Sequence, residues 1–155
     1  MLLERSEILE MAKVTVNELL NRVMVTHERS LPMYLAFAAP FVGHGDEAAS
    51  EVLSQIVTDH KYLSEKFHDY LLEQNYPVGH GQWDMNFTSM HDVSLHYLLA
   101  EIVRREKSII ADLTKYAQLL EKAPAARALI QEALGMAKGH LESLEELSHV
   151  AVART

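Results

Sequence analysis

Apolar residues recur at intervals of three and four along almost the whole chain, and this period constrains the fold more than any other feature. Strand signals are missing, because no segment alternates strictly between apolar and polar residues and β-branched residues do not cluster. Breaker sequences divide the chain at "GHGD" (43–46), at 75–92 and at "KAPAA" (122–126). The sequence therefore predicts an all-α protein with four helical segments, at 4–42, 46–74, 92–122 and 124–152, and with a kink or split in the first at Pro32.

The lengths of the linkers predict how these segments connect. The two short linkers favour antiparallel hairpins, one from the first two segments and one from the last two. The connection 75–92 is unusually long for a compact domain. At ~3.3 Å per extended residue it can reach roughly 59 Å, further than the roughly 44 Å of a helix of about 29 residues. We therefore expect a four-helix bundle with one long crossover between the second and third helices; a loop between adjacent helix ends is the alternative.

The length of 155 residues suits a single domain, 1–155, with one core. The first segment is longer than its partner, so residues 1–15 are expected to overhang the bundle at its N-terminal end. The apolar face of an overhanging helix needs cover from the crossover or from another subunit. We therefore expect a homo-oligomer, most simply a twofold homodimer.

Composition excludes several classes of function. The formal net charge of -8 opposes binding to nucleic acid or to an anionic membrane surface. The absence of cysteine excludes thiolate-bound metal and leaves nine histidines, with Asp and Glu, as candidate ligands. The N-terminus has no signal-peptide pattern, and the longest apolar stretch, 31–43, contains two prolines and is too short for a bilayer. We expect a cytoplasmic protein without a membrane span.

Two Glu-x-x-His motifs, at 65–68 and 146–149, have the spelling of a carboxylate-bridged metal site. Helical phase argues against them. At ~100° per residue, Glu65 and Glu146 fall opposite the apolar stripes of their own segments. We predict that both motifs lie on solvated faces and take no part in a site.

Other polar residues interrupt the apolar stripes near the middle of each helical segment. They are His27 and Glu28 in the first segment, Asp59 and His60 in the second, Glu106 in the third and His140 in the fourth. Buried imidazoles and carboxylates are costly unless they are paired or bound to metal. Interruptions in four helices at one level favour a shared polar site, which is either a metal site or a metal-free network of hydrogen bonds.

Two stretches, 26–60 and "GMAKGHLESLEEL" at 135–147, resemble the first hairpin and last helix of the ferritin-like superfamily, the bundles that include bacterioferritins and rubrerythrins. The resemblance covers roughly residues 20–150. It implies a site built from the first-helix carboxylate Glu28, the histidines His60 and His140, and the third-helix carboxylate Glu106. The chain departs from the family three residues before each histidine, where Val57 and Ala137 replace metal-binding glutamates.

The remaining ligands, with Asp59 and His27 added, suffice for one divalent ion or two weakly held ones. Imidazole with carboxylate suits iron, manganese or zinc, and for a redox-active ion the resemblance implies oxygen or peroxide chemistry. One alternative is a metal-free helical bundle that acts as an oligomerisation or binding module. A second is a hemerythrin-like domain, because "HKYLSE" and "HLESLE" place Glu five residues after His. No phosphate loop, nucleophile elbow or dinucleotide fingerprint identifies an organic substrate, so enzymatic activity stays open.

Overall fold

The computed structural model describes residues 4–38, 40, 42–90 and 93–153, and its regular elements are all helical, as the sequence predicts. Within these ranges no strand occurs. The elements are α1 (Arg5–Glu28), α2 (Leu31–Ala38), α3 (Glu47–Glu73), the short 3-10 helix η1 (Met85–Ser89), α4 (Leu95–Leu119) and α5 (Pro124–Ala153). Among the helices described, none combines the length and the apolar character that a membrane crossing requires.

The first helical segment is split into α1 and α2 close to Pro32, as expected. Pro32 is the second residue of α2, where a missing backbone N–H costs little. The backbone of Arg29 still donates to the carbonyl of Val25 at 2.8 Å, which closes α1. Ser30 lies between the two helices, and its hydroxyl accepts a hydrogen bond from the backbone N–H of Met33 at 3.3 Å. The serine therefore caps the first turn of α2.

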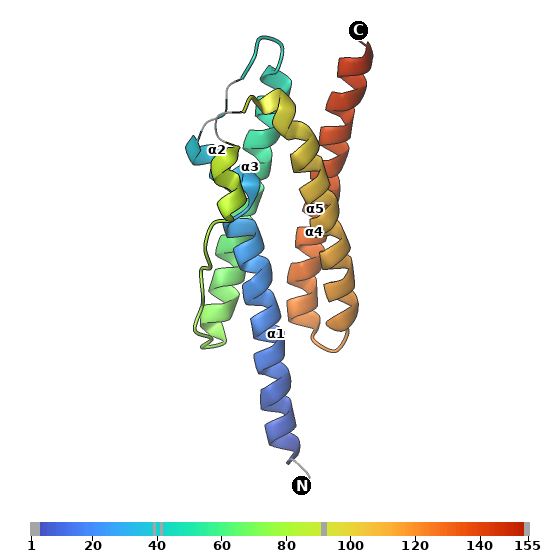
Figure 1. The fold of residues 1–155 in the computed structure, drawn as a ribbon. Coiled ribbons are helices and arrows are strands. Elements are labelled where there is room, and N and C mark those ends of the chain that lie inside the picture. The colour runs from blue at the N-terminus through green and yellow to red at the C-terminus, as the bar shows by residue number, and fades with distance from the viewer. Residues whose placement is uncertain (1–3, 39, 41, 91–92, 154–155) are drawn as a thin grey trace.

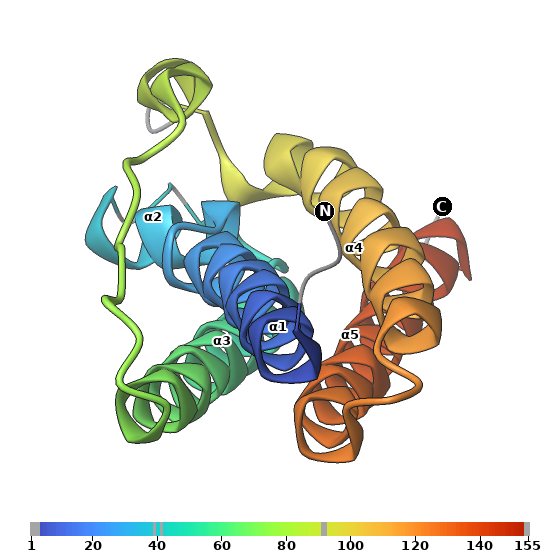
Figure 2. The same ribbon diagram turned by 90° about the horizontal axis from the view of Figure 1, so that it is seen from below.

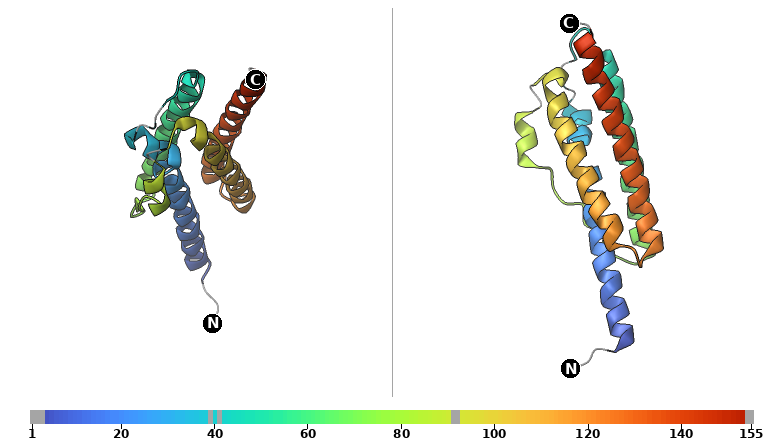
Figure 3. Two further views of the ribbon diagram at one scale, coloured as in Figure 1. Left: turned by 45° about the horizontal axis from the view of Figure 1, so that its top comes forward. Right: turned by 90° about the vertical axis from the view of Figure 1, so that its right-hand side faces the viewer.

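The four long helices lie roughly along one axis, with α1 and α5 running in one direction and α3 and α4 in the other (Figures 1 and 2). α1 packs against α3, and α4 packs against α5, as two antiparallel hairpins. The segment between α3 and α4 returns from one end of the molecule to the other and carries η1, so that α3 and α4 point the same way (Figure 1). A second pair of views shows α5 beside α3, and the first turns of α1 project beyond the other helices (Figure 3).

The apolar core consists of two clusters, one on each side of a polar layer. The first cluster includes Leu20, Val23, Met24, Leu63, Phe67, Leu113, Ile130 and Ala137. The second includes Leu31, Leu35, Ile56, Leu98, Ile102 and Leu144. Along each long helix, a candidate site residue lies between the residues of the two clusters: His27, His60, Glu106 and His140, all buried. The polar layer is thus sealed at both ends by apolar side chains.

The returning segment is fixed against α1 by polar contacts to its backbone. The side chain of Asn21 donates to the carbonyl of Gly79 at 3.2 Å and accepts from its N–H at 3.0 Å. Nε of Arg29 donates to the carbonyl of His80 at 3.2 Å. Gly81 follows with a φ of +60°, and a Cβ there would lie 2.7 Å from Cγ1 of Val25. Glycine is required at this position for both reasons.

Replacing Gly81 with alanine is expected to lower the free energy of unfolding by about 1 to 3 kcal/mol, because the new methyl group meets a stiff valine and the backbone is left-handed. Gly135→Ala in α5 is the matched control. No atom lies within 4 Å of a Cβ built there, and a helical alanine should add about 0.5 to 1 kcal/mol. Urea unfolding compares the two variants, and equal effects would contradict the close contact with Val25.

Candidate metal centre

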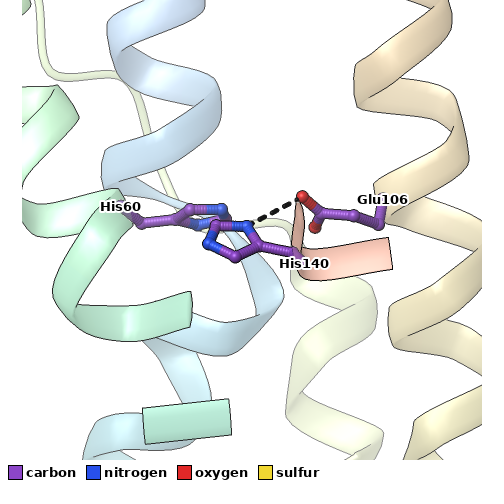
Figure 4. A group of neighbouring side chains, drawn as sticks. All are labelled: His60, Glu106 and His140. Atoms are coloured by element: carbon purple, nitrogen blue, oxygen red, sulfur yellow. Dashed lines mark hydrogen bonds and ion pairs between the residues drawn. The ribbon is translucent and has the colours of Figure 1, made fainter. Parts of the chain in front are cut away.

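Three buried side chains from three helices converge in the polar layer. His60 comes from α3, Glu106 from α4 and His140 from α5, and one ligand atom from each lies within 4.8 Å of the others. The two imidazole rings lie close together, with centroids 5.7 Å apart. The carboxylate of Glu106 approaches His140 from the side opposite His60 (Figure 4). No more than 6% of any of the three residues is exposed. Such a group can hold a metal ion.

His140 contacts a carboxylate through each of its ring nitrogens. Nδ1 lies 3.2 Å from Oε1 of Glu106, and Nε2 lies 2.6 Å from Oδ2 of Asp59. Ionised carboxylates only accept hydrogen bonds, so contact with one at each nitrogen favours a ring that is protonated at both. Burial alone lowers the pKa of His140, but the hydrogen bonds and charges of Glu106 and Asp59 together raise it above its ordinary value. The two carboxylate contacts therefore favour the charged form of His140.

His60 is prepared in the opposite charge state. Burial, and then the neighbouring imidazoles of His27 and His140, hold its pKa well below the ordinary value, so the ring is neutral. Its Nδ1 lies 2.7 Å from the hydroxyl oxygen of Ser30. Nε2 forms no hydrogen bond with any described residue. A neutral imidazole with one nitrogen anchored and the other unused is the form in which histidine binds metal.

His27, at the edge of the group, resembles His60 in having one anchored ring nitrogen and a lowered pKa. Its Nδ1 lies 2.8 Å from the carbonyl of Val23, one turn earlier in α1, and so donates to it. Burial lowers its pKa, and the ring stands edge-on to His60 with centroids 4.9 Å apart. Its other face stacks on Phe67. His27 thus borders the three ligands as a second neutral imidazole.

Glu28, expected as a ligand, is not one of the three residues that converge. Its carboxylate lies 3.0 Å from Nδ1 of His80, a residue of the returning segment, and a quarter or more of the side chain is exposed. Glu28 follows His27 directly, so it points about 100° away around the helix. Because His27 faces inward, Glu28 cannot. The first helix therefore contributes an imidazole where the resemblance places a carboxylate.

The two Glu-x-x-His motifs lie outside the group. Glu65 and Glu146 are both exposed, as helical phase predicts. His68 is half-buried and stacks on His80, away from the three ligands. The side chain of His149 lies outside the described residues.

Sequence reasoning missed Ser30, which anchors His60 from the break between α1 and α2. A signal was present, because serine followed two residues later by proline is the pattern of a helix start. The pattern identifies the cap but not its second partner, which comes from another helix. The role of Asp59 as the partner of His140 is likewise visible only once α3 and α5 are packed together.

Two cavities approach the group from different sides. One of about 620 Å³ lies between α1, the returning segment and α4, and its lining includes Ser30 and Glu106. The other, of about 380 Å³, lies between α3 and α5 and reaches His140. Glu106 and His140 thus each border a cavity.

Comparison with protein-family models, with curated proteins and with solved structures finds no match to this chain. The functional interpretation therefore depends on the geometry of the polar layer.

Proposed function

We propose that this protein binds one divalent metal ion through His60, Glu106 and His140, in a bundle of ferritin-like type. The observation that carries the proposal is the convergence of these three buried side chains from three helices, with ligand atoms within 4.8 Å of one another. The long returning segment between α3 and α4 supports the ferritin-like part, because that connection distinguishes such bundles from those with short loops only. Two imidazoles and a carboxylate suit iron, manganese or zinc.

The protein's own groups have defined tasks in this proposal. On metal binding His140 would release the proton at Nδ1 to solvent and offer that nitrogen as a ligand, while Nε2–H would continue to donate to Asp59. Asp59 is then the carboxylate that orients a ligating histidine, a common arrangement around bound metals. His60 offers its unused nitrogen without losing a proton. Iron or manganese would supply oxygen or peroxide chemistry, and His27 is the nearest further imidazole.

The decisive test is metal content in two double variants. Titration of metal-free protein with Zn²⁺, Mn²⁺ and Fe²⁺ should give one bound ion per chain, and His60→Ala with His140→Ala should abolish it. Glu65→Ala with Glu146→Ala is the matched control, expected to keep the metal and to change stability by no more than about 0.5 kcal/mol. Metal lost in the glutamate pair and retained in the histidine pair would overturn the assignment.

A metal-free role is favoured by one observation: hydrogen bonds of His140 to Glu106 and Asp59 link α3, α4 and α5 without an ion. On this second candidate function the bundle acts as an oligomerisation or binding module. The histidine double variant would then lose roughly 1 to 3 kcal/mol for each buried partner left unsatisfied, and the wild type would take up no metal.

The hemerythrin-like alternative receives no support from the packing, because its extra carboxylates, Glu65 and Glu145, are both exposed.

A homodimer is also part of the proposal. The first turns of α1 project beyond the other helices, and a second copy would cover them (Figure 1). Light scattering at micromolar concentration should give twice the chain mass. A monomer whose melting temperature is unchanged after removal of residues 1–15 would contradict it.

A further inference from the structure

The larger cavity has a polar rim and an apolar wall. Val25 and Leu31 line it from the first two helices, Ile102 and Ile109 from α4, and Phe87 from η1. Around these lie four arginines, Arg22, Arg29, Arg104 and Arg105, and three carboxylates, Asp84, Glu106 and Asp112. A cavity of this kind matches a ligand with an apolar body and a polar head.

Two of the arginines are already committed to acidic partners. Arg104 and Arg105 both bind the carboxylate of Glu101, with Nε of Arg105 at 2.7 Å and Nε of Arg104 at 3.0 Å. Arg105 also stacks over the ring of Phe87, 4.8 Å from its centroid. These two side chains shape the wall of the cavity and keep little capacity for a ligand.

Arg29 has capacity for an anion. Its guanidinium lies over Trp83, 4.9 Å from the ring centroid, and only its Nε is engaged, by the carbonyl of His80. Among the described residues no carboxylate forms an ion pair with Arg29 or with Arg22. The guanidinium of Arg29 is thus fixed in orientation while its two terminal nitrogens stay available, which favours planar, two-point recognition of a carboxylate.

The second cavity is the more acidic of the two, which supports this assignment. Glu51 and Glu146 line the approach to His140 between α3 and α5, and no lysine or arginine does. A cation reaching the group is favoured on that side. An anion is favoured on the side of Arg22 and Arg29.

We propose that the cavity between α1, the returning segment and α4 binds an organic carboxylate with an apolar body, held by the guanidinium of Arg29. Glu106, a proposed metal ligand, and Ser30, which contacts His60, line the same cavity. A ligand bound there therefore lies next to the metal-binding group. That the ligand is a substrate of this group rests on the proposed function. Binding itself does not, because Arg29 and the apolar wall of the cavity are not among the three metal ligands.

The experiment is calorimetric titration of the metal-free protein, kept in EDTA, with hexanoate. Hexanamide lacks the charge, and acetate lacks the apolar body. We expect hexanoate to bind more tightly than either by about tenfold or more, and Arg29→Gln to weaken hexanoate binding by about tenfold. Arg127→Gln is the matched control, because Nε of Arg127 also donates to a backbone carbonyl, that of Ala117 at 3.1 Å, outside this cavity. It should retain the wild-type affinity within about twofold.

Equal affinities for hexanoate and hexanamide, or equal losses in the two arginine variants, would overturn the carboxylate site. So would an absence of hexanoate binding in protein that binds zinc, a result that leaves the metal proposal intact. Hexanoate binding in protein that takes up no metal would support the cavity and remove only its link to a metal reaction. Tighter hexanoate binding after zinc loading, lost in Arg29→Gln, would support both.

Discussion

Lowering the pH from about 6 to about 5 is expected to reduce the free energy of unfolding of the metal-free protein through His27 and His60, each by no more than about 1.4 kcal/mol. Both imidazoles have lowered pKa values because they are buried. They stay neutral in the folded state and take up protons on unfolding, so stability falls as the pH drops below the ordinary histidine value of about 6.5. Each contributes at most about 1.4 kcal/mol per pH unit.

His140 acts with the opposite sign. Its pKa is raised, so its stabilising contribution is fully present below about pH 6.5 and is lost as the pH rises through the folded value. The three histidines together therefore place maximal stability close to the ordinary histidine pKa. Urea unfolding at a series of pH values in EDTA measures the curve.

Two variants identify which histidines cause the loss of stability at acidic pH. His60→Gln, which cannot titrate, should reduce the slope between about pH 6 and about pH 5. His44→Gln replaces a fully exposed histidine and should leave the slope unchanged. If the free energy of unfolding fell equally steeply with decreasing pH in both variants, a neutral buried His60 would be contradicted.

Glu106→Leu is expected to lower the free energy of unfolding of the metal-free protein by about 3 kcal/mol. The substitution roughly conserves volume, so the loss is electrostatic. His140 would keep Asp59 as a partner but have a buried N–H at Nδ1 without one, and the layer would lose its most buried negative charge. The pKa of His140 should fall toward its ordinary value, which NMR titration of the ring detects.

Glu101→Leu is the matched control on the same helix. Glu101 also binds two cationic side chains, Arg104 and Arg105, but 26% of its side chain is exposed, against 2% for Glu106. Its loss should cost no more than about 1 kcal/mol. A similar cost for the two variants would indicate that burial does not control the energetics of the layer.

The sequence predicts the level of the polar layer because helical period converts positions into directions. His60, Glu106 and His140 interrupt stripes of aliphatic residues, and all three are buried at one level. The same argument separates the exposed Glu65 and Glu146 from the group, although both belong to Glu-x-x-His motifs, the pattern typical of a carboxylate-bridged metal site. All-α architecture follows from the same pattern.

Helical phase does not predict which residue faces inward where two adjacent polar residues both lie at the edge of an apolar stripe. His27 and Glu28 differ by about 100° around the helix, and the apolar stripe of the first helix is compatible with either residue facing inward. The resemblance to the ferritin-like superfamily then favours the carboxylate. The structure decides for His27 because Glu28 finds an outer partner in His80, and that partner depends on the path of the returning segment.

The cavity that we assign to a carboxylate could not be predicted for a related reason. Its wall is the segment between α3 and α4, whose path is fixed by the contacts of Asn21 with Gly79 and of Arg29 with His80. Loops of this length carry no period, so their course depends on individual contacts between distant residues.

The hydroxyl of Ser30 meets both the backbone of Met33 and the ring of His60. One oxygen atom thus joins the start of α2 to the orientation of a ligand in the polar layer. Rotation of the His60 ring would withdraw a partner from the cap, and local opening of α2 would release the ring. The rate at which the Met33 amide exchanges with deuterium should therefore report events inside the bundle from a helix at its periphery.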